Sequence, residues 1–140
     1  MLFVLAYITG VVKEHKDITK DTLVDRCYFH CCTAQNGGAL YISSIKTFTC
    51  VDTTFYQCNA TLRGGAIYIE GTSVNGTIQR CCASSCSTSK NLDGQFMRMN
   101  SGIGLLMENT AVTFCSNGLK EGDAPITILH SSIKDRKSVV

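Results

Sequence analysis

The chain of 140 residues has no tryptophan, a single proline and little charge, since only 17% of its residues are Asp, Glu, Lys or Arg. Thirteen basic against eleven acidic residues leave a formal charge of +2, which is too small to favour a nucleic-acid partner. No apolar stretch approaches the roughly 20 residues that a membrane-spanning helix needs. With 44% hydrophobic residues, the chain is nevertheless too apolar to be disordered, and its length suits one domain.

Nine cysteines are many for a chain of this length. Such usage fits a secreted or surface protein in an oxidising compartment, or a fold that buries thiols as small hydrophobic groups. The odd number leaves at least one thiol unpaired within the chain. Two sequons for N-linked glycosylation, at Asn59 and Asn75, point weakly to an extracellular location.

An internal repeat organises the sequence. Residues 37–42 (GGALYI) recur as residues 64–69 (GGAIYI), with an offset of 27 (64 − 37). An aromatic-x-x-Cys motif precedes each copy, and its weaker forms Ala-x-x-Cys and Val-x-x-Cys follow later in the chain. The four motifs begin at Phe29, Phe55, Ala83 and Val112 and end at Cys32, Cys58, Cys86 and Cys115.

The repeat length and composition indicate short strands. A unit of about 27 residues is too short for helical repeats, which need about 33 to 47, and the regular leucine ladder of leucine-rich repeats does not occur. The segments are rich in Ile, Val, Tyr, Phe and Thr and are broken by Gly, Asn and Ser. The sequence therefore predicts an all-β, right-handed parallel β-helix of about four coils. We expect a partial first coil and polar loop at 1–21, β-helix repeats at 22–130 and a flexible tail at 131–140.

Stacked coils would place equivalent side chains about 4.8 Å apart. We expect one inner column to contain Leu40, Ile67, Met97 and Ile126, and a second to contain Phe29 and Phe55. At the alternate position Tyr41, Tyr68, Arg98 and Thr127 would form an exposed binding face. The Gly-Gly pairs would turn the chain sharply, with positive φ. A further column upstream of the aromatic-x-x-Cys motif comprises Val24, Cys50, Ile78 and Met107.

The motif cysteines Cys32, Cys58, Cys86 and Cys115 would form a structural ladder. Their stacking distance lies within the window for disulfides, but parallel stacking aims the Cβ vectors alike. A ladder of buried free thiols is the favoured interpretation, and cross-links are the alternative. A zinc site is not indicated, because the halves of the loose C-x3-C pattern lie two coils apart. An outer column of Arg26, Asp52, Arg80 and Asn109 alternates in sign and suggests a surface ion-pair ladder.

Residues 1–8 (MLFVLAYI) admit two interpretations. A signal peptide fits the apolar run but lacks the usual basic residue before it. A first strand fits the repeat, because residues 6–8 (AYI) match residues 40–42 (LYI), with a polar loop at 13–17. No amphipathic capping helix is visible at either end. We therefore expect coil-to-coil continuation or self-association at open ends, as in a piece of a longer solenoid.

The paired motifs resemble the repeats of polymorphic outer membrane proteins and related right-handed β-helix surface proteins, which share the pectin-lyase-like solenoid. The signatures of those repeats are GGA[ILV] and FxxN. Residues 37–40 and 64–67 match the first, and Phe29 and Phe55 match the second, whereas Cys32 and Cys58 stand where Asn is usual. The resemblance implies adhesins or surface antigens, often membrane-anchored, without a catalytic centre.

We therefore expect a non-enzymatic adhesion or display scaffold at the cell surface or outside the cell, with no cofactor and no membrane span in this chain. Its partner would be a protein or a glycan, and any membrane attachment would use a segment outside this chain. The alternative is a carbohydrate-binding or polysaccharide-degrading β-helix protein. Such enzymes need carboxylates stacked on one outer face, and the predicted outer column contains none. A third class, a small disulfide-stapled secreted effector, also remains open.

Overall fold

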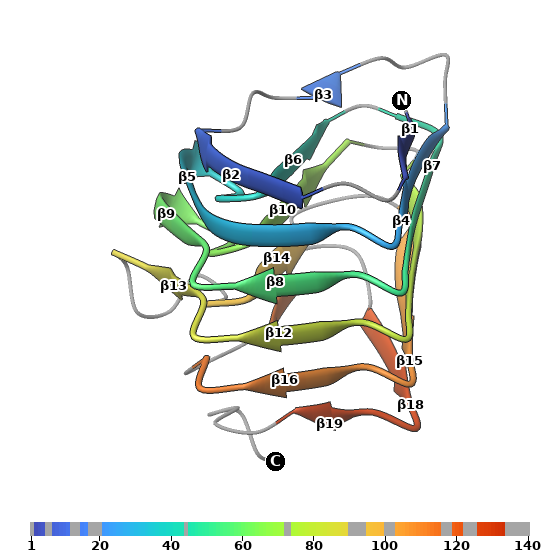
Figure 1. Ribbon diagram of the computed structural model, residues 1–140. Helices are drawn as coiled ribbons and strands as arrows, with labels where there is room; N and C mark the ends of the chain where they lie inside the picture. The colour runs from blue at the N-terminus through green and yellow to red at the C-terminus, as the bar shows by residue number, and fades with distance from the viewer. Residues whose placement is uncertain are drawn as a thin grey trace.

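A computed structural model describes residues 2–4, 7–11, 15–16, 21–43, 45–71, 74–89, 95–99, 103–115, 119–121 and 126–133, and the side chains of residues from 21 onward except those of 119–121. The described residues form short strands in three sheets, and every strand pair is parallel. The coils succeed one another from β2 and β5 to β19 (Figure 1). This is the parallel β-helix that the sequence predicts.

Each sheet is a stack of equivalent strands from successive coils. Sheet A contains β1 (Leu2–Val4), β4 (Thr22–Asp25), β7 (Thr47–Val51), β11 (Asn75–Gln79), β15 (Gly104–Glu108) and β18 (Ile126–Leu129). Sheet B contains β13 (Ser87–Thr88), β9 (Asn59–Arg63), β5 (Tyr28–Asn36), β8 (Thr54–Tyr56), β12 (Cys82–Ser84), β16 (Ala111–Thr113) and β19 (Ser132–Ile133), with β2 (Tyr7–Val11) paired to β5. Sheet C contains β17 (Leu119–Glu121), β14 (Met97–Met99), β10 (Ile67–Glu70), β6 (Leu40–Ser43) and β3 (His15–Lys16).

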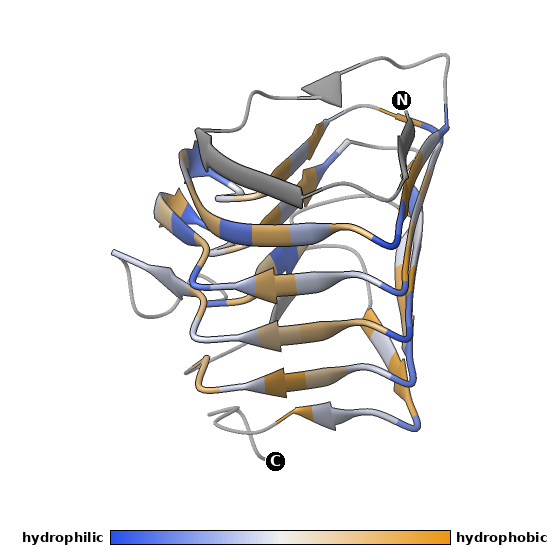
Figure 2. Cartoon of the chain, viewed as in Figure 1, coloured by the Kyte–Doolittle hydropathy of each residue, from blue (hydrophilic) through white to orange (hydrophobic). Residues whose placement is uncertain are grey.

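The core consists of inward-facing columns, one or two from each sheet. In sheet A, Val24, Cys50, Ile78 and Met107 lie in register and are fully buried. In sheet B, the rings of Phe29 and Phe55 stack with centroids 5.1 Å apart and planes 4° apart. Each such large side chain contributes roughly 1.5–3 kcal/mol by its burial. Figure 2 shows the resulting pattern, with a hydrophobic residue in the middle of β8, β12 and β16.

The glycine pairs are needed for two different reasons. Gly37 and Gly64 have φ of 61° and 58°, in the left-handed region that favours glycine. Gly38 and Gly65 are instead confined by the next coil. A Cβ at Gly38 would lie 2.3 Å from the Gly65 carbonyl oxygen, and one at Gly65 would lie 1.9 Å from the Gln95 carbonyl oxygen.

The fourth coil is shorter than the sequence predicts. Three in-register steps along sheet A measure 28 residues from Phe48 to Gly76 (76 − 48), 29 to Leu105 (105 − 76) and only 21 to Ile126 (126 − 105). The chain shortens because only residues 116–118 separate Cys115 from Leu119, the start of β17. In the second coil, eight residues (59–66) separate Cys58 from Ile67.

This shortening overturns part of the predicted register. Ile126 was expected to continue the column of Leu40, Ile67 and Met97, but it pairs with Leu105 in sheet A, and Leu119 takes its place beside Met97. Thr127 likewise pairs with Leu106, and the residue in register with Arg98 is Lys120. The prediction assumed a coil of full length.

The first strands also differ from their predicted register. Tyr7 and Ile8 pair with Tyr28 and Phe29 in sheet B, and do not match residues 40–42 in sheet C. The partner of β6 on that side is β3, which falls within the segment predicted as a polar loop. At the other end, β19 pairs with β16, so strand pairing extends past residue 130. Most of the predicted tail, residues 134–140, lies outside the described residues.

Candidate functional site

Two corners of each coil share one backbone design. At each corner a non-glycine residue adopts φ between 47° and 56°, and the next residue turns a small side chain inward. This left-handed residue redirects the chain, either between two short strands or, at Cys31, within β5. Corner one joins sheet A to sheet B and has positive φ at Arg26, Asp52, Arg80, Asn109 and His130. Corner two lies within sheet B and has positive φ at Cys31, Gln57, Ser85 and Phe114.

The four motif cysteines are the inward residues of corner two, and each is at most 1% exposed. Their Sγ atoms lie within 3.2–3.8 Å of the carbonyl oxygen two residues earlier, as Cys115 does with Thr113 at 3.2 Å. The backbone N–H of Cys86 donates to Cys115 Sγ at 3.3 Å. A thiol at this corner can therefore donate within its own coil and accept from the preceding one.

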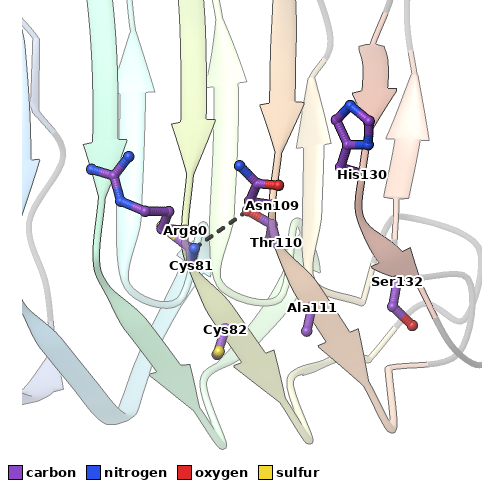
Figure 3. A pocket seen from close by; sticks show the side chains of 8 residues that line it. All are labelled: Arg80, Cys81, Cys82, Asn109, Thr110, Ala111, His130 and Ser132. Carbon is purple, nitrogen blue, oxygen red and sulfur yellow. Dashed lines mark hydrogen bonds between the residues drawn. The ribbon is translucent and has the colours of Figure 1, made fainter.

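Hydroxyl groups perform the same task at corner one. Thr53 Oγ1 donates to the Val51 carbonyl at 2.8 Å and accepts from the Cys27 backbone N–H at 3.2 Å. Thr110 repeats the arrangement and accepts from the Cys81 backbone N–H at 3.3 Å, the dashed line in Figure 3. The common requirement is a small side chain that both donates and accepts, which satisfies backbone groups that the turn removes from the sheet ladder.

All nine cysteines are free thiols, and seven of them are buried. Burial, followed by a hydrogen bond with Cys81, raises the pKa of the Cys50 thiol. Hydrogen bonds with neighbouring thiols, together with burial, raise the pKa of Cys32 and Cys86. A neutral, buried thiol is a poor nucleophile. Cys32, Cys50 and Cys86 therefore serve packing and hydrogen bonding.

The outer side of corner one carries the alternating charges. Arg80 donates to Asp52 through Nε at 2.8 Å and through Nη2 at 3.2 Å, which links the second and third coils. This hydrogen bonding lowers the pKa of the Asp52 carboxyl. Arg26 pairs instead with its neighbour Asp25 at 3.1 Å. The column is therefore a partial ion-pair ladder.

The predicted binding face of sheet C is largely covered. Tyr41, Tyr68 and Arg98 are in register, but Tyr68 is only 1% exposed. Its hydroxyl donates to Glu70 Oε2 at 2.9 Å, and the Tyr41 hydroxyl donates to the same carboxylate. The Arg63 guanidinium lies over the Tyr68 ring, 5.8 Å from its centroid. These side chains form a packed cluster, in which the hydroxyls and the ring face are already occupied.

The sequence did not predict a half-exposed group of aromatic side chains on sheet B. The His30 and Tyr56 rings stack across two coils, with centroids 5.5 Å apart and planes 6° apart, and Tyr28 stacks on His30 at 5.8 Å. Beside them the exposed Cys31 places Sγ 3.3 Å from His30 Nε2 and 3.5 Å from Gln57 Oε1. Strand alternation would send His30 and Cys31 to opposite faces, but the left-handed φ of 54° at Cys31 keeps both outside.

A surface pocket of about 420 Å³ lies along corner one. Arg80, Asn109 and His130 from three successive coils border it, together with Cys82 (Figure 3). Among the residues that the structure describes, no carboxylate lines it.

The two sequons lie on the surface. Asn59 begins β9, and Asn75 begins β11, and both side chains are exposed. Within the described ranges, no group of three or more His, Cys, Asp or Glu side chains is placed so that it could hold a metal ion. Nor does that part of the chain contain a helix long and apolar enough to cross a membrane.

Comparison with known proteins adds no relative to this description: no protein-family model, curated protein sequence or solved structure matches the chain. The fold is shown by the three parallel sheets and their register.

Proposed function

We propose that this chain is a non-enzymatic β-helix scaffold of a surface or secreted protein, whose outer columns bind a protein or a glycan partner. The observation that carries the proposal is the stacked group of Tyr28, His30 and Tyr56, which stays half-exposed on sheet B. Aromatic rings with one polar end favour binding surfaces, because they combine apolar area with a hydrogen-bonding group.

The corner ladders support membership of the polymorphic outer membrane protein-like repeats. In those repeats Asn is usual where Cys32 and Cys58 stand here. Each of these thiols contacts the carbonyl oxygen two residues earlier, a polar contact that suits a side chain able to donate and accept. The replacement of Asn by Cys is therefore compatible with the same coil. Such proteins act at cell surfaces, and the exposed sequons at Asn59 and Asn75 suit that location.

A carbohydrate is the favoured partner among the two classes. The outward column that contains His30 and Tyr56 continues as Ser84 and Thr113, so rings and hydroxyl groups lie in one line. Sugar recognition combines stacking of the ring on aromatic faces with hydrogen bonds to hydroxyls, and this line supplies both.

Binding of the purified chain to an array of glycans tests the proposal. We expect a bound glycan class, and we expect Tyr56→Ala to reduce its affinity roughly tenfold, the effect of losing about 1.4 kcal/mol of ring contact. Thr49→Ala, at a half-exposed position on β7 of sheet A and outside this column, is the matched control and should bind as the unaltered chain does. Equal binding by both variants would contradict the assignment of the face, and cleavage of a polysaccharide would contradict the non-enzymatic role.

A further inference from the structure

The nine thiols divide sharply by their surroundings. Seven are buried at the corners and in the core, and among these the pKa values of Cys32, Cys50 and Cys86 are raised by burial and by hydrogen bonds with neighbouring thiols. Only Cys31 and Cys82 are exposed. In its column Cys82 lies between Thr54 and Ala111. Cys31 instead lies beside an imidazole, with Sγ 3.3 Å from His30 Nε2.

The position of His30 is fixed by its neighbours. Its ring stacks on Tyr56 of the next coil, 5.5 Å away with planes 6° apart, and on Tyr28 of the same strand. Gln57 of the next coil approaches Cys31 from the other side, with Oε1 3.5 Å from Sγ. The thiol donates to this amide oxygen, and His30 Nε2 lies on its other side, where the neutral imidazole nitrogen can take up the proton. A nucleophile within hydrogen-bond reach of an oriented base is the arrangement that activates thiols.

From this geometry we propose that Cys31 is a thiol-exchange site, at which a small-molecule disulfide forms a mixed disulfide with the protein. His30 is the base of this site, and Tyr56 and Gln57 are its positioning residues. The proposal goes beyond the binding role, because it assigns covalent chemistry to one exposed side chain.

The exchange balances without any further reagent. His30 Nε2 accepts the Cys31 proton, and the thiolate attacks one sulfur of the disulfide RSSR. A bond forms between Cys31 Sγ and that sulfur while the original S–S bond breaks. The leaving thiolate takes the proton from His30 and departs as RSH. Cys31 is oxidised, the departing sulfur is reduced, and the products are the mixed disulfide and one thiol.

Oxidised glutathione is the probe for this site. The fully reduced chain is incubated with it, and mass spectrometry of the intact protein and of its peptides follows each adduct over time. We expect one glutathione adduct to form first, on Cys31, and we expect Cys82 to react more slowly. The variant Cys31→Ser should lose the fast adduct. A fast adduct on Cys82 or on a buried cysteine would overturn the proposal, and so would a covalent dimer through Cys31 without any glutathione adduct.

The role of the imidazole needs its own variant. His30→Phe keeps a ring to stack on Tyr56 but removes the base, and we expect it to slow the adduct on Cys31 roughly tenfold or more, against the roughly 10²–10⁴-fold of full general-base catalysis. His130→Phe, which removes the exposed histidine near the pocket of corner one, is the matched control and should leave the rate unchanged. Circular dichroism checks that both variants retain the β fold. An unchanged rate in His30→Phe would show that exposure alone controls the reaction.

Discussion

The second and third coils, residues 47–70 and 75–99, use one backbone design but place one buried phenylalanine ring in different columns. The second coil has Phe55 in one column and the small Ala66 in another. The third coil reverses this, with Ala83 in register with Phe55 and Phe96 following Ala66. The Phe96 ring contacts the Phe55 ring, with centroids 5.6 Å apart. The Phe96 ring therefore packs against Phe55 from another column, where the third coil places only Ala83 in register with that ring.

The same two coils differ in their need for glycine. Gly65 is confined by the third coil, because backbone atoms of Ser87 in β13 and of Gln95 lie close to the position that a Cβ of residue 65 would take. Gln95 takes the position of Gly65 one coil later, and its side chain is accommodated there, 8% exposed. The fourth coil has only residues 116–118 between corner two and sheet C, too few to repeat the segment that confines Gly65. A glycine is therefore required only where a full-length coil follows.

The largest expected effect comes from adding one methyl group in the second coil. Gly65→Ala would place a Cβ 1.9 Å from the Gln95 carbonyl oxygen and 2.7 Å from that of Ser87, both backbone atoms of the next coil. We expect a loss of more than about 4 kcal/mol in the free energy of unfolding, or failure to fold. Thermal unfolding followed by circular dichroism measures it. Gln95→Ala at the equivalent position is the control and should cost far less, so equal losses would break the comparison.

The exchange of volume between columns is tested by moving the ring back. Phe96→Ala should cost about 3–5 kcal/mol because it leaves a cavity beside Phe55, and Ala83→Phe should cost about 1–3 kcal/mol by overpacking. The double variant should recover much of the sum, since the new ring fills the space that the other leaves. Urea unfolding of all four proteins gives the coupling energy. Additive losses would show that the two columns pack independently.

A smaller effect is expected at corner one, where the second coil uses a hydroxyl and the third a thiol. Thr53→Ala removes the acceptor of the Cys27 backbone N–H and the donor to the Val51 carbonyl. We expect it to lower the free energy of unfolding by about 1–3 kcal/mol, the cost of leaving buried polar groups unsatisfied. Thr53→Cys, which copies Cys81 of the third coil, should retain more of that stability. Urea unfolding separates the two, and equal losses would mean that the corner does not need a side-chain hydrogen bond.

The sequence predicts the fold because the repeat unit occurs twice in the chain with nearly identical residues. The GGA motif of coils one and two and the spacing of Phe29 and Phe55 set one register, and the cysteines extend it to residue 115. Beyond that point the register depended on an assumed coil length. After Cys115, most of the segment between corner two and sheet C is missing, and no residue pattern marks this shortening. Ile126 was therefore predicted in the column of Met97, in sheet C, although it lies in sheet A.

The candidate sites were harder to predict, because they depend on backbone angles and on coverage by neighbours. Tyr68 occupies an outward position, as alternation predicts, yet Arg63, Tyr41 and Glu70 cover it. The contact between His30 and Cys31 depends on the left-handed φ of Cys31, and this position has neither the glycine nor the asparagine that usually indicates such a φ. The sequence does contain one usable signal: in every repeat the residue before the ladder cysteine occupies the same corner, so Cys31 is equivalent to Gln57, Ser85 and Phe114.

The weakest expected contribution is the ion pair that joins the outer corners of the second and third coils. Asp52 and Arg80 are well exposed, so solvent and salt screen their attraction. Asp52→Asn should shift the thermal midpoint less than any variant above, and added salt should reduce the difference further.

Because the hydrogen bond from Arg80 lowers the folded-state pKa of Asp52, the pair stabilises the chain above the ordinary carboxyl pKa. That stabilisation is lost as pH falls through the folded-state pKa, so below that pKa the variant and the unaltered chain should melt alike. A difference between the two that persists at low pH would mean that the side chain acts through packing, and the two coils would then be joined by their backbone ladders and core columns alone.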